Sequence, residues 1–127
     1  MIVNFIGEYD CKVDAKGRIL LTSGFRKQMG QALPFCFFIK KHTHEQCLEL
    51  YTQKEWEHIT QVINSSLDEE IQAQREFMQD AIMIESDTRG RVRIPSPLLK
   101  QVEITTDVIL TGHHGKIEIW QPALYYE

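Results

Sequence analysis

The sequence of 127 residues has little cysteine and no long apolar run. Its three cysteines, Cys11, Cys36 and Cys47, are an odd number without a Cys-x-x-Cys pair, which argues against a disulfide framework and for a reducing compartment. No apolar stretch approaches the ~20 residues of a membrane-spanning helix, and the first residues lack the basic region and cleavage site of a signal peptide. These absences predict a cytoplasmic chain without a membrane partner.

Motifs of catalysis and metal binding are also missing. The sequence has no phosphate-cradling glycine loop, no nucleophile elbow and no carboxylate pair whose placement the spacing fixes, which argues against an enzyme. A cluster that resembles a metal site, His42-Thr43-His44 with Cys47, lacks a fourth ligand and a second closely spaced pair. We therefore predict no catalytic residue, no metal site and no cofactor.

Charge is unevenly distributed, although the totals nearly balance. The 14 Lys and Arg residues against 18 Asp and Glu give a net charge of −4, which speaks against indiscriminate coating of nucleic acid. Acidic residues dominate between positions 54 and 80, whereas basic residues dominate the flanks on either side. A chain that is negative overall can therefore still present a positive face.

A short motif occurs twice and organises the chain. The segment Asp14-Ala15-Lys16-Gly17-Arg18 recurs 73 positions later as Asp87-Thr88-Arg89-Gly90-Arg91, and each copy joins two β-like runs. An aspartate at the start of a turn accepts hydrogen bonds from backbone N–H groups two residues on, and glycine supplies positive φ. We therefore predict turn-shaping roles for Asp14, Gly17, Asp87 and Gly90.

The basic residues of the motif exceed what a turn requires. Long Lys and Arg side chains at the tip of a hairpin can reach an anionic partner. The predicted binding residues are Lys16, Arg18, Arg89 and Arg91. On the residues alone, two alternatives stay open: the charges bind a partner, or they are merely solvated.

The segments beside the motif repeat as well. In the first half we expect a strand at 8–13, a hairpin return at 19–21, a short helix that Gly30 ends, and strands at 35–39 and 47–51. The second half retraces this order, with strands at 108–110 and 117–120. Two copies are too few for a solenoid, so a closed pseudo-twofold pair is the better architecture.

The region between the repeats is helical in pattern. Capping boxes, Thr52 with Glu55 and Ser66 with Glu69, each precede apolar residues at helical spacing. This predicts two helices within 52–80, or one helix that is interrupted near position 65.

The doubled motif, the strand endings Leu48-Glu49-Leu50-Tyr51 and Ile117-Glu118-Ile119-Trp120, and the helices between them resemble the MraZ family of bacterial transcriptional regulators over almost the whole chain. The resemblance implies a mainly β fold with helices (α+β), in which two AbrB-like swapped-hairpin repeats form one pseudo-twofold β-barrel. The implied division is a first repeat at 1–53, a helical connector at 54–80 and a second repeat at 81–127.

The resemblance also implies a function. Members form ring-shaped homo-oligomers that bind short repeats in double-stranded DNA upstream of the division and cell-wall gene cluster, so the chain is expected to be nucleoid-associated. The family's DNA-reading Asp-x-x-x-Arg motif maps onto Asp14 with Arg18 and Asp87 with Arg91, and contact with bases and contact with phosphates are both open. The first copy departs from the family at 21–23, where an Ile-Pro step like that at 94–95 is usual.

An alternative from another functional class is an AbrB-type protein-interaction module of the antitoxin kind. Such antitoxins typically join one repeat to a disordered tail that binds the partner. This chain instead carries the repeat twice, which favours the regulator.

Overall fold

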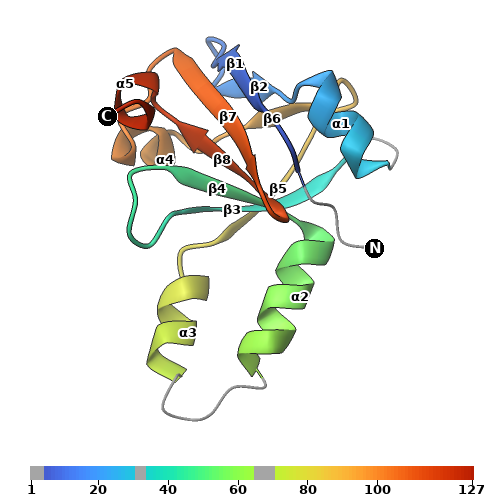
Figure 1. Cartoon of the computed structure of the whole chain (residues 1–127), viewed down its shortest axis with the longest axis vertical. Helices are drawn as coiled ribbons and strands as arrows, with labels where there is room; N and C mark the ends of the chain where they lie inside the picture. Colours follow the sequence, from blue (N-terminus) through green and yellow to red (C-terminus); the bar gives the residue numbers. More distant parts are fainter. Residues whose placement is uncertain (1–4, 31–33, 65–70) are drawn as a thin grey trace.

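The computed structural model describes residues 5–30, 34–64 and 71–127, and excludes the side chains of 62–64 and 71–74. A six-stranded antiparallel sheet forms its centre, and two further strands pair as a separate ribbon (Figure 1). In spatial order the sheet contains β1 (Glu8–Lys12), β7 (Asp107–His113), β8 (Lys116–Trp120), β4 (Leu48–Thr52), β3 (Cys36–Lys41) and β5 (Ile82–Glu85). The ribbon consists of β2 (Arg18–Leu20) and β6 (Arg91–Arg93).

The order of the sheet is symmetric about its central pair, β4 and β8. The edge strand β1 pairs with β7 of the second half, and the edge strand β5 pairs with β3 of the first half. The registers agree: Tyr9 faces Leu110, and the corresponding residue of the other half, Ile82, faces Ile39. Each half of the chain therefore completes the sheet of the other.

The predicted closed barrel is wrong. The sheet is open, with β1 and β5 as its edges, and the ribbon is a separate unit. The strand expected at 19–21 is present as β2, and it follows the turn antiparallel to the preceding residues, with an isolated bridge between Val13 and Ile19. Its main partner, however, is β6 of the other half of the chain. Ile19 and its ribbon partner Val92 are each 1% exposed. Because both side chains are buried against the core, β2 and β6 pair with each other and do not extend the edges of the main sheet.

Helix α1 (Ser23–Met29) agrees with the sequence prediction at both ends. The Thr22 side chain accepts a hydrogen bond from the backbone N–H of Phe25, and Gly30 ends the helix in the left-handed region with φ 63°. Phe25 and Met29 point into the core. Its counterpart α4 (Ser96–Gln101) buries Leu98, so both halves place one short helix after the ribbon strand. Helix α5 (Pro122–Tyr125) follows β8.

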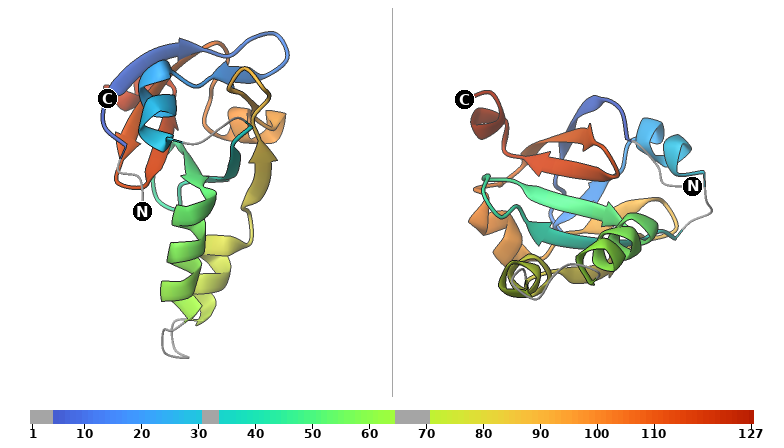
Figure 2. Two further views of the ribbon diagram at one scale, coloured as in Figure 1. Left: turned by 90° about the vertical axis from the view of Figure 1, so that its right-hand side faces the viewer. Right: turned by 60° about the horizontal axis from the view of Figure 1, so that its bottom comes forward.

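Helices α2 (Gln53–Asn64) and α3 (Ile71–Met78) project from the sheet at the end of the molecule opposite the ribbon (Figure 1, Figure 2). The threonine half of the predicted box at Thr52 is present, since its hydroxyl accepts a bond from the Glu55 N–H at 3.1 Å. The box at 66–69 lies outside the described residues. Helix α3 is therefore the second helix that the sequence pattern predicted within 52–80. No helix in the described part is long and apolar enough to span a membrane.

A stack of aromatic rings fixes the two helices to the sheet. Trp56 of α2 stacks on Phe38 of β3 with ring centroids 5.1 Å apart, and on Phe77 of α3 at 5.5 Å. Such pairs stabilise beyond the apolar area that they bury. Trp56 is thus the contact that all three elements share.

We expect Trp56→Ala to lower the free energy of unfolding by about 3–5 kcal/mol, because it removes a buried indole and leaves two ring faces without a partner. His58→Ala, on an exposed part of the same helix, should change it by less than about 0.5 kcal/mol. Urea unfolding followed by circular dichroism measures both. Equal losses for the two variants would contradict the role of the stack.

Candidate functional site

The first copy of the motif folds into a turn that Asp14 closes. Its Oδ1 accepts hydrogen bonds from the backbone N–H groups of Lys16 and Arg18, both at 2.9 Å, and its Oδ2 accepts from Arg18 Nε at 2.8 Å. Gly17 has φ 79°, which glycine adopts without strain. The backbone N–H of Arg18 is the largest cause that lowers the pKa of Asp14, and the Arg18 side chain adds to it against an opposing desolvation. The carboxylate is therefore charged at neutral pH.

The second copy repeats this geometry. Asp87 Oδ1 accepts from the backbone N–H groups of Arg89 and Arg91 at 2.9 Å, and Oδ2 accepts from Arg91 Nε at 2.6 Å. Gly90 has φ 84°. The same donors, led by the backbone N–H of Arg91, lower the pKa of Asp87 to about 2. The two turns are thus equivalent in their hydrogen bonding.

Each turn holds one cation in place and leaves another free. Arg18 and Arg91 are tied to their aspartates through Nε, and their side chains are 25% and 30% exposed. In the described part of the chain, no group accepts from their terminal Nη atoms, which carry the remaining donors of the guanidinium. Lys16 and Arg89 are exposed. All four predicted binding residues therefore keep donors that an outside anion can reach.

The ribbon brings the two turns into one unit. The Gly17 carbonyl accepts from the Ile94 N–H at 2.9 Å, and the Gly90 carbonyl accepts from the Leu21 N–H at 3.1 Å. The turns therefore lie at opposite ends of the paired strands. At ~3.3 Å per residue, the path from Gly17 to Leu21 places them about 13 Å apart.

Side chains alternate between the two faces of the ribbon. Ile19 and Val92 point inward, whereas the four other side chains point outward. We call these outward residues the ribbon face: Arg18, Leu20, Arg91 and Arg93. The structure thus places both motif arginines on one side of the molecule.

Arg93 was absent from the predicted binding residues, although it is exposed on the same face as Arg91. The sequence could have indicated Arg93, because residues two apart on a strand share a face and Arg93 follows Arg91 by two. Arg93 also lies directly opposite Arg18 in the ribbon. The cationic surface therefore extends beyond the two turns.

Arg26 of α1 is a further cation that the motif did not indicate. A β-carbon at Gly90 would lie 2.9 Å from Arg26 Cδ, so this side chain packs directly on the second turn. Its Nε is buried and has no hydrogen-bond partner among the described residues. The contact joins distant parts of the chain, so no local sequence pattern could have predicted it.

A second polar cluster lies on the sheet beside α3. Glu49, 3% exposed, accepts from Lys40 at 3.0 Å, from the Tyr51 hydroxyl at 2.9 Å, and from Lys116. Burial alone would raise the pKa of Glu49, but the hydrogen bonds and charges of Lys116 and Lys40 outweigh it and lower the pKa. Lys40 also lies over the Phe77 ring, 4.6 Å from its centroid. This cluster helps to fix α3 to the sheet.

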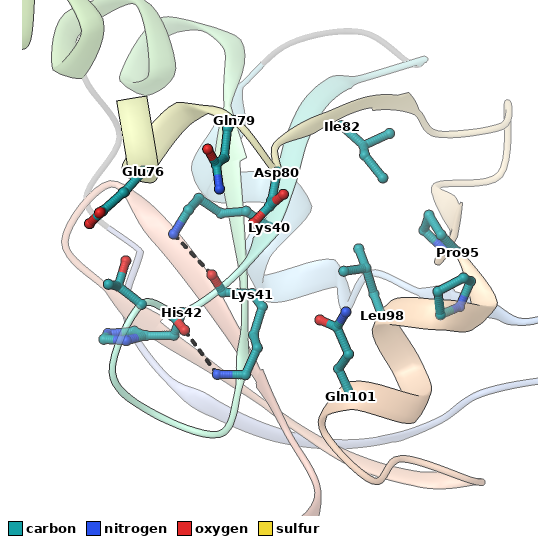
Figure 3. Close-up of a pocket in the computed structure, with 12 residues that line it drawn as sticks. Lys40, Lys41, His42, Glu76, Gln79, Asp80, Ile82, Pro95, Leu98 and Gln101 are labelled. Carbon is teal, nitrogen blue, oxygen red and sulfur yellow. Dashed lines mark hydrogen bonds between the residues drawn. The ribbon is translucent and has the colours of Figure 1, made fainter. Parts of the chain in front are cut away.

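The cluster is poorly suited to a metal ion. His42, Glu49 and Glu118 bring ligand atoms within 4.8 Å of one another. The Glu49 oxygens already accept from two ammonium groups, however, and these positive charges oppose a cation at the same place. The neighbouring hollow of about 520 Å³ lies between Lys40, Lys41 and the end of α3 on one side and Pro95, Leu98 and Gln101 on the other (Figure 3). Lys40 and Lys41 donate to the carbonyls of Lys41 and His42 there, at 2.9 and 3.0 Å.

The fold and the site define a mainly β protein whose ribbon carries a cationic turn at each end. The chain belongs to the MraZ family, because the family model described as "MraZ protein, putative antitoxin-like" matches residues 4–80 and again residues 77–127. It is 36% identical to "Transcriptional regulator MraZ" of Flavobacterium psychrophilum, in a match that covers 94% of this chain and 78% of that protein. Proteins of the same name match at 33% identity in Christiangramia forsetii (98% of this chain, 82% of that protein) and 34% in Phocaeicola vulgatus (96% and 82%).

The lowered pKa of Asp87 predicts an acid-sensitive turn. A carboxylate whose pKa is lowered by folding stabilises the folded state above its ordinary pKa, and this contribution is lost as the pH falls to the folded pKa. We expect Asp87→Asn to be less stable than the parent at pH 7, with a difference that shrinks below pH 3.8 and vanishes near pH 2. Urea unfolding at several pH values measures it.

Asp107→Asn is a matched control, because Asp107 is exposed and forms a loose pair with Lys12 at 3.8 Å. Its effect should be small at every pH. A difference for Asp87→Asn that persisted unchanged at pH 2 would show that the charge of Asp87 does not stabilise the turn.

Proposed function

We propose that the protein is a transcriptional regulator that binds double-stranded DNA through the ribbon face and the two turns. The observation that carries the proposal is the placement of Arg18 and Arg91, from two equivalent turns, on one exposed side of a single ribbon. The printed names of the relatives, which are transcriptional regulators, support the same function.

The dimensions of the ribbon suit the major groove of DNA. That groove is about 12 Å wide and admits a two-stranded β-ribbon. With the turns about 13 Å apart at ~3.3 Å per residue, each turn can approach the phosphates on one side of the groove while the ribbon face lies over the bases between them. Lys16 and Arg89 at the turns then contact phosphates, and Arg18 and Arg91 point toward the groove.

The electrostatics agree with such a partner. The acidic residues Glu55 and Glu57 belong to α2, which projects at the end opposite the ribbon (Figure 2). A chain with a net charge of −4 therefore turns its positive end toward DNA and keeps its negative end away. Each phosphate that Lys16 or Arg89 neutralises contributes roughly −0.9 to the slope of the log–log salt dependence.

We further propose that the two halves are AbrB-like swapped-hairpin repeats, 1–53 and 81–127, joined by the connector 54–80. One ribbon face is small and would bind weakly alone. A ring-shaped homo-oligomer presents many such faces to repeated sites and gains affinity through effective concentration. The repeats upstream of the division and cell-wall gene cluster are the proposed target, which makes the protein nucleoid-associated.

The family description also names an antitoxin-like character, which keeps a protein partner as the second candidate function. An AbrB-type interaction module would retain a toxin at fixed stoichiometry. Affinity purification that yields such a partner, together with absent binding to DNA, would favour this function over the regulator.

We expect the double variant Arg18→Ala, Arg91→Ala to abolish specific DNA binding, because each charged hydrogen bond contributes about 1.5–3 kcal/mol. Electrophoretic shift assays with the DNA upstream of the chain's own gene, at two salt concentrations, measure the affinity and its salt slope. Circular dichroism and light scattering should show unchanged folding and assembly. Lys54→Ala removes an exposed cation at the helical end and should bind like the parent. Parent-like binding by the double variant would refute the proposed interface.

A further inference from the structure

The ribbon face is symmetric at two of its four positions and asymmetric at the other two. The register pairs Arg18 with Arg93 and Leu20 with Arg91, across the central pair of Ile19 and Val92. A half-turn about that central pair exchanges Arg18 with Arg91, which are alike. The same rotation exchanges Leu20 with Arg93, which are chemically different.

Arg93 is a surplus cation in its surroundings. It lies directly opposite Arg18, and like charges at facing positions destabilise an antiparallel pair. Asp14 is bonded to Arg18, and in the described part of the chain no acceptor engages the Arg93 guanidinium. An electron-rich partner outside the chain would relieve this repulsion.

Leu20 is equally hard to explain by packing or by phosphate binding. Its side chain is 49% exposed, and it occupies the outward position that faces Arg91. An exposed leucine between cations cannot contact a phosphate favourably. An apolar group on a base edge is a suitable partner, since the thymine methyl lies in the major groove.

We propose that Arg93 and Leu20 determine base specificity, with Arg93 donating to guanine O6 and N7 and Leu20 contacting a thymine methyl. This inference rests on the proposed function. It gives each protomer a direction on DNA, because the two ends of one ribbon then recognise unlike half-sites. Arg18 and Arg91, held by their aspartates, contribute equally to both half-sites and cannot supply this direction.

Selection of binding sites from a library of short randomised DNA duplexes tests the proposal with the parent and two variants. The parent should select a site with unlike halves and prefer guanine at one position by about 5- to 150-fold. Arg93→Leu should lose that preference and select a site with like halves. Leu20→Arg should select like halves too, with guanine in both.

Lys54→Leu is the matched control, because it removes one exposed positive charge outside the ribbon, and it should select the parent site. Leu20 and Arg93 are both exposed, so neither substitution should prevent folding, and circular dichroism checks this for each variant. Either variant alone is sufficient for the test. If Arg93→Leu and Leu20→Arg select the parent site with only a uniform change in affinity, the directional proposal is overturned and DNA binding stands. A parent that binds no duplex overturns the proposed function itself.

Discussion

The bond from each motif aspartate to the arginine four residues later is the constraint on which the rest of the site depends. One carboxylate satisfies two backbone N–H groups and one guanidinium Nε, so a single side chain both shapes the turn and aims the arginine. Because the arginine side chain has already lost conformational entropy in the free protein, less entropy is lost when a partner binds it. The same bond cancels one positive charge in each turn, so net attraction depends on the untethered cations.

The scaffold explains why two such turns act together. Each turn joins an edge strand of the sheet, β1 or β5, to a ribbon strand, and burial of Ile19 and Val92 fixes the ribbon on the core. At the opposite end, Trp56 and the buried ion pair of Lys40 with Glu49 hold the two helices on the sheet. Charge separation along the molecule is therefore a consequence of packing at both ends.

The sequence predicted what is local and missed what is not. The cap at Thr22, the stop at Gly30 and the helix that follows Thr52 depend on neighbours within a few residues, and the structure agrees with them. The closed barrel was wrong, because β2 and β6 pair with each other outside the main sheet although they lie far apart in the sequence, and no spacing reveals that pairing. Period-two alternation could have identified Arg93, whereas the position of Arg26 on Gly90 required the fold.

A duplicated motif on a nearly twofold ribbon does not by itself fix the orientation in which the protein binds an asymmetric DNA site. If the four outward positions were alike in pairs, a half-turn of the protein would present the same surface, and a promoter could not fix its orientation. The tethered arginines cannot break this degeneracy, since equivalent hydrogen bonds to their aspartates constrain both in the same way. On the ribbon face, the positions that no aspartate constrains are free to differ. Leu20 and Arg93 are the positions on the ribbon face that do differ, so affinity and direction reside in separate residues of one surface.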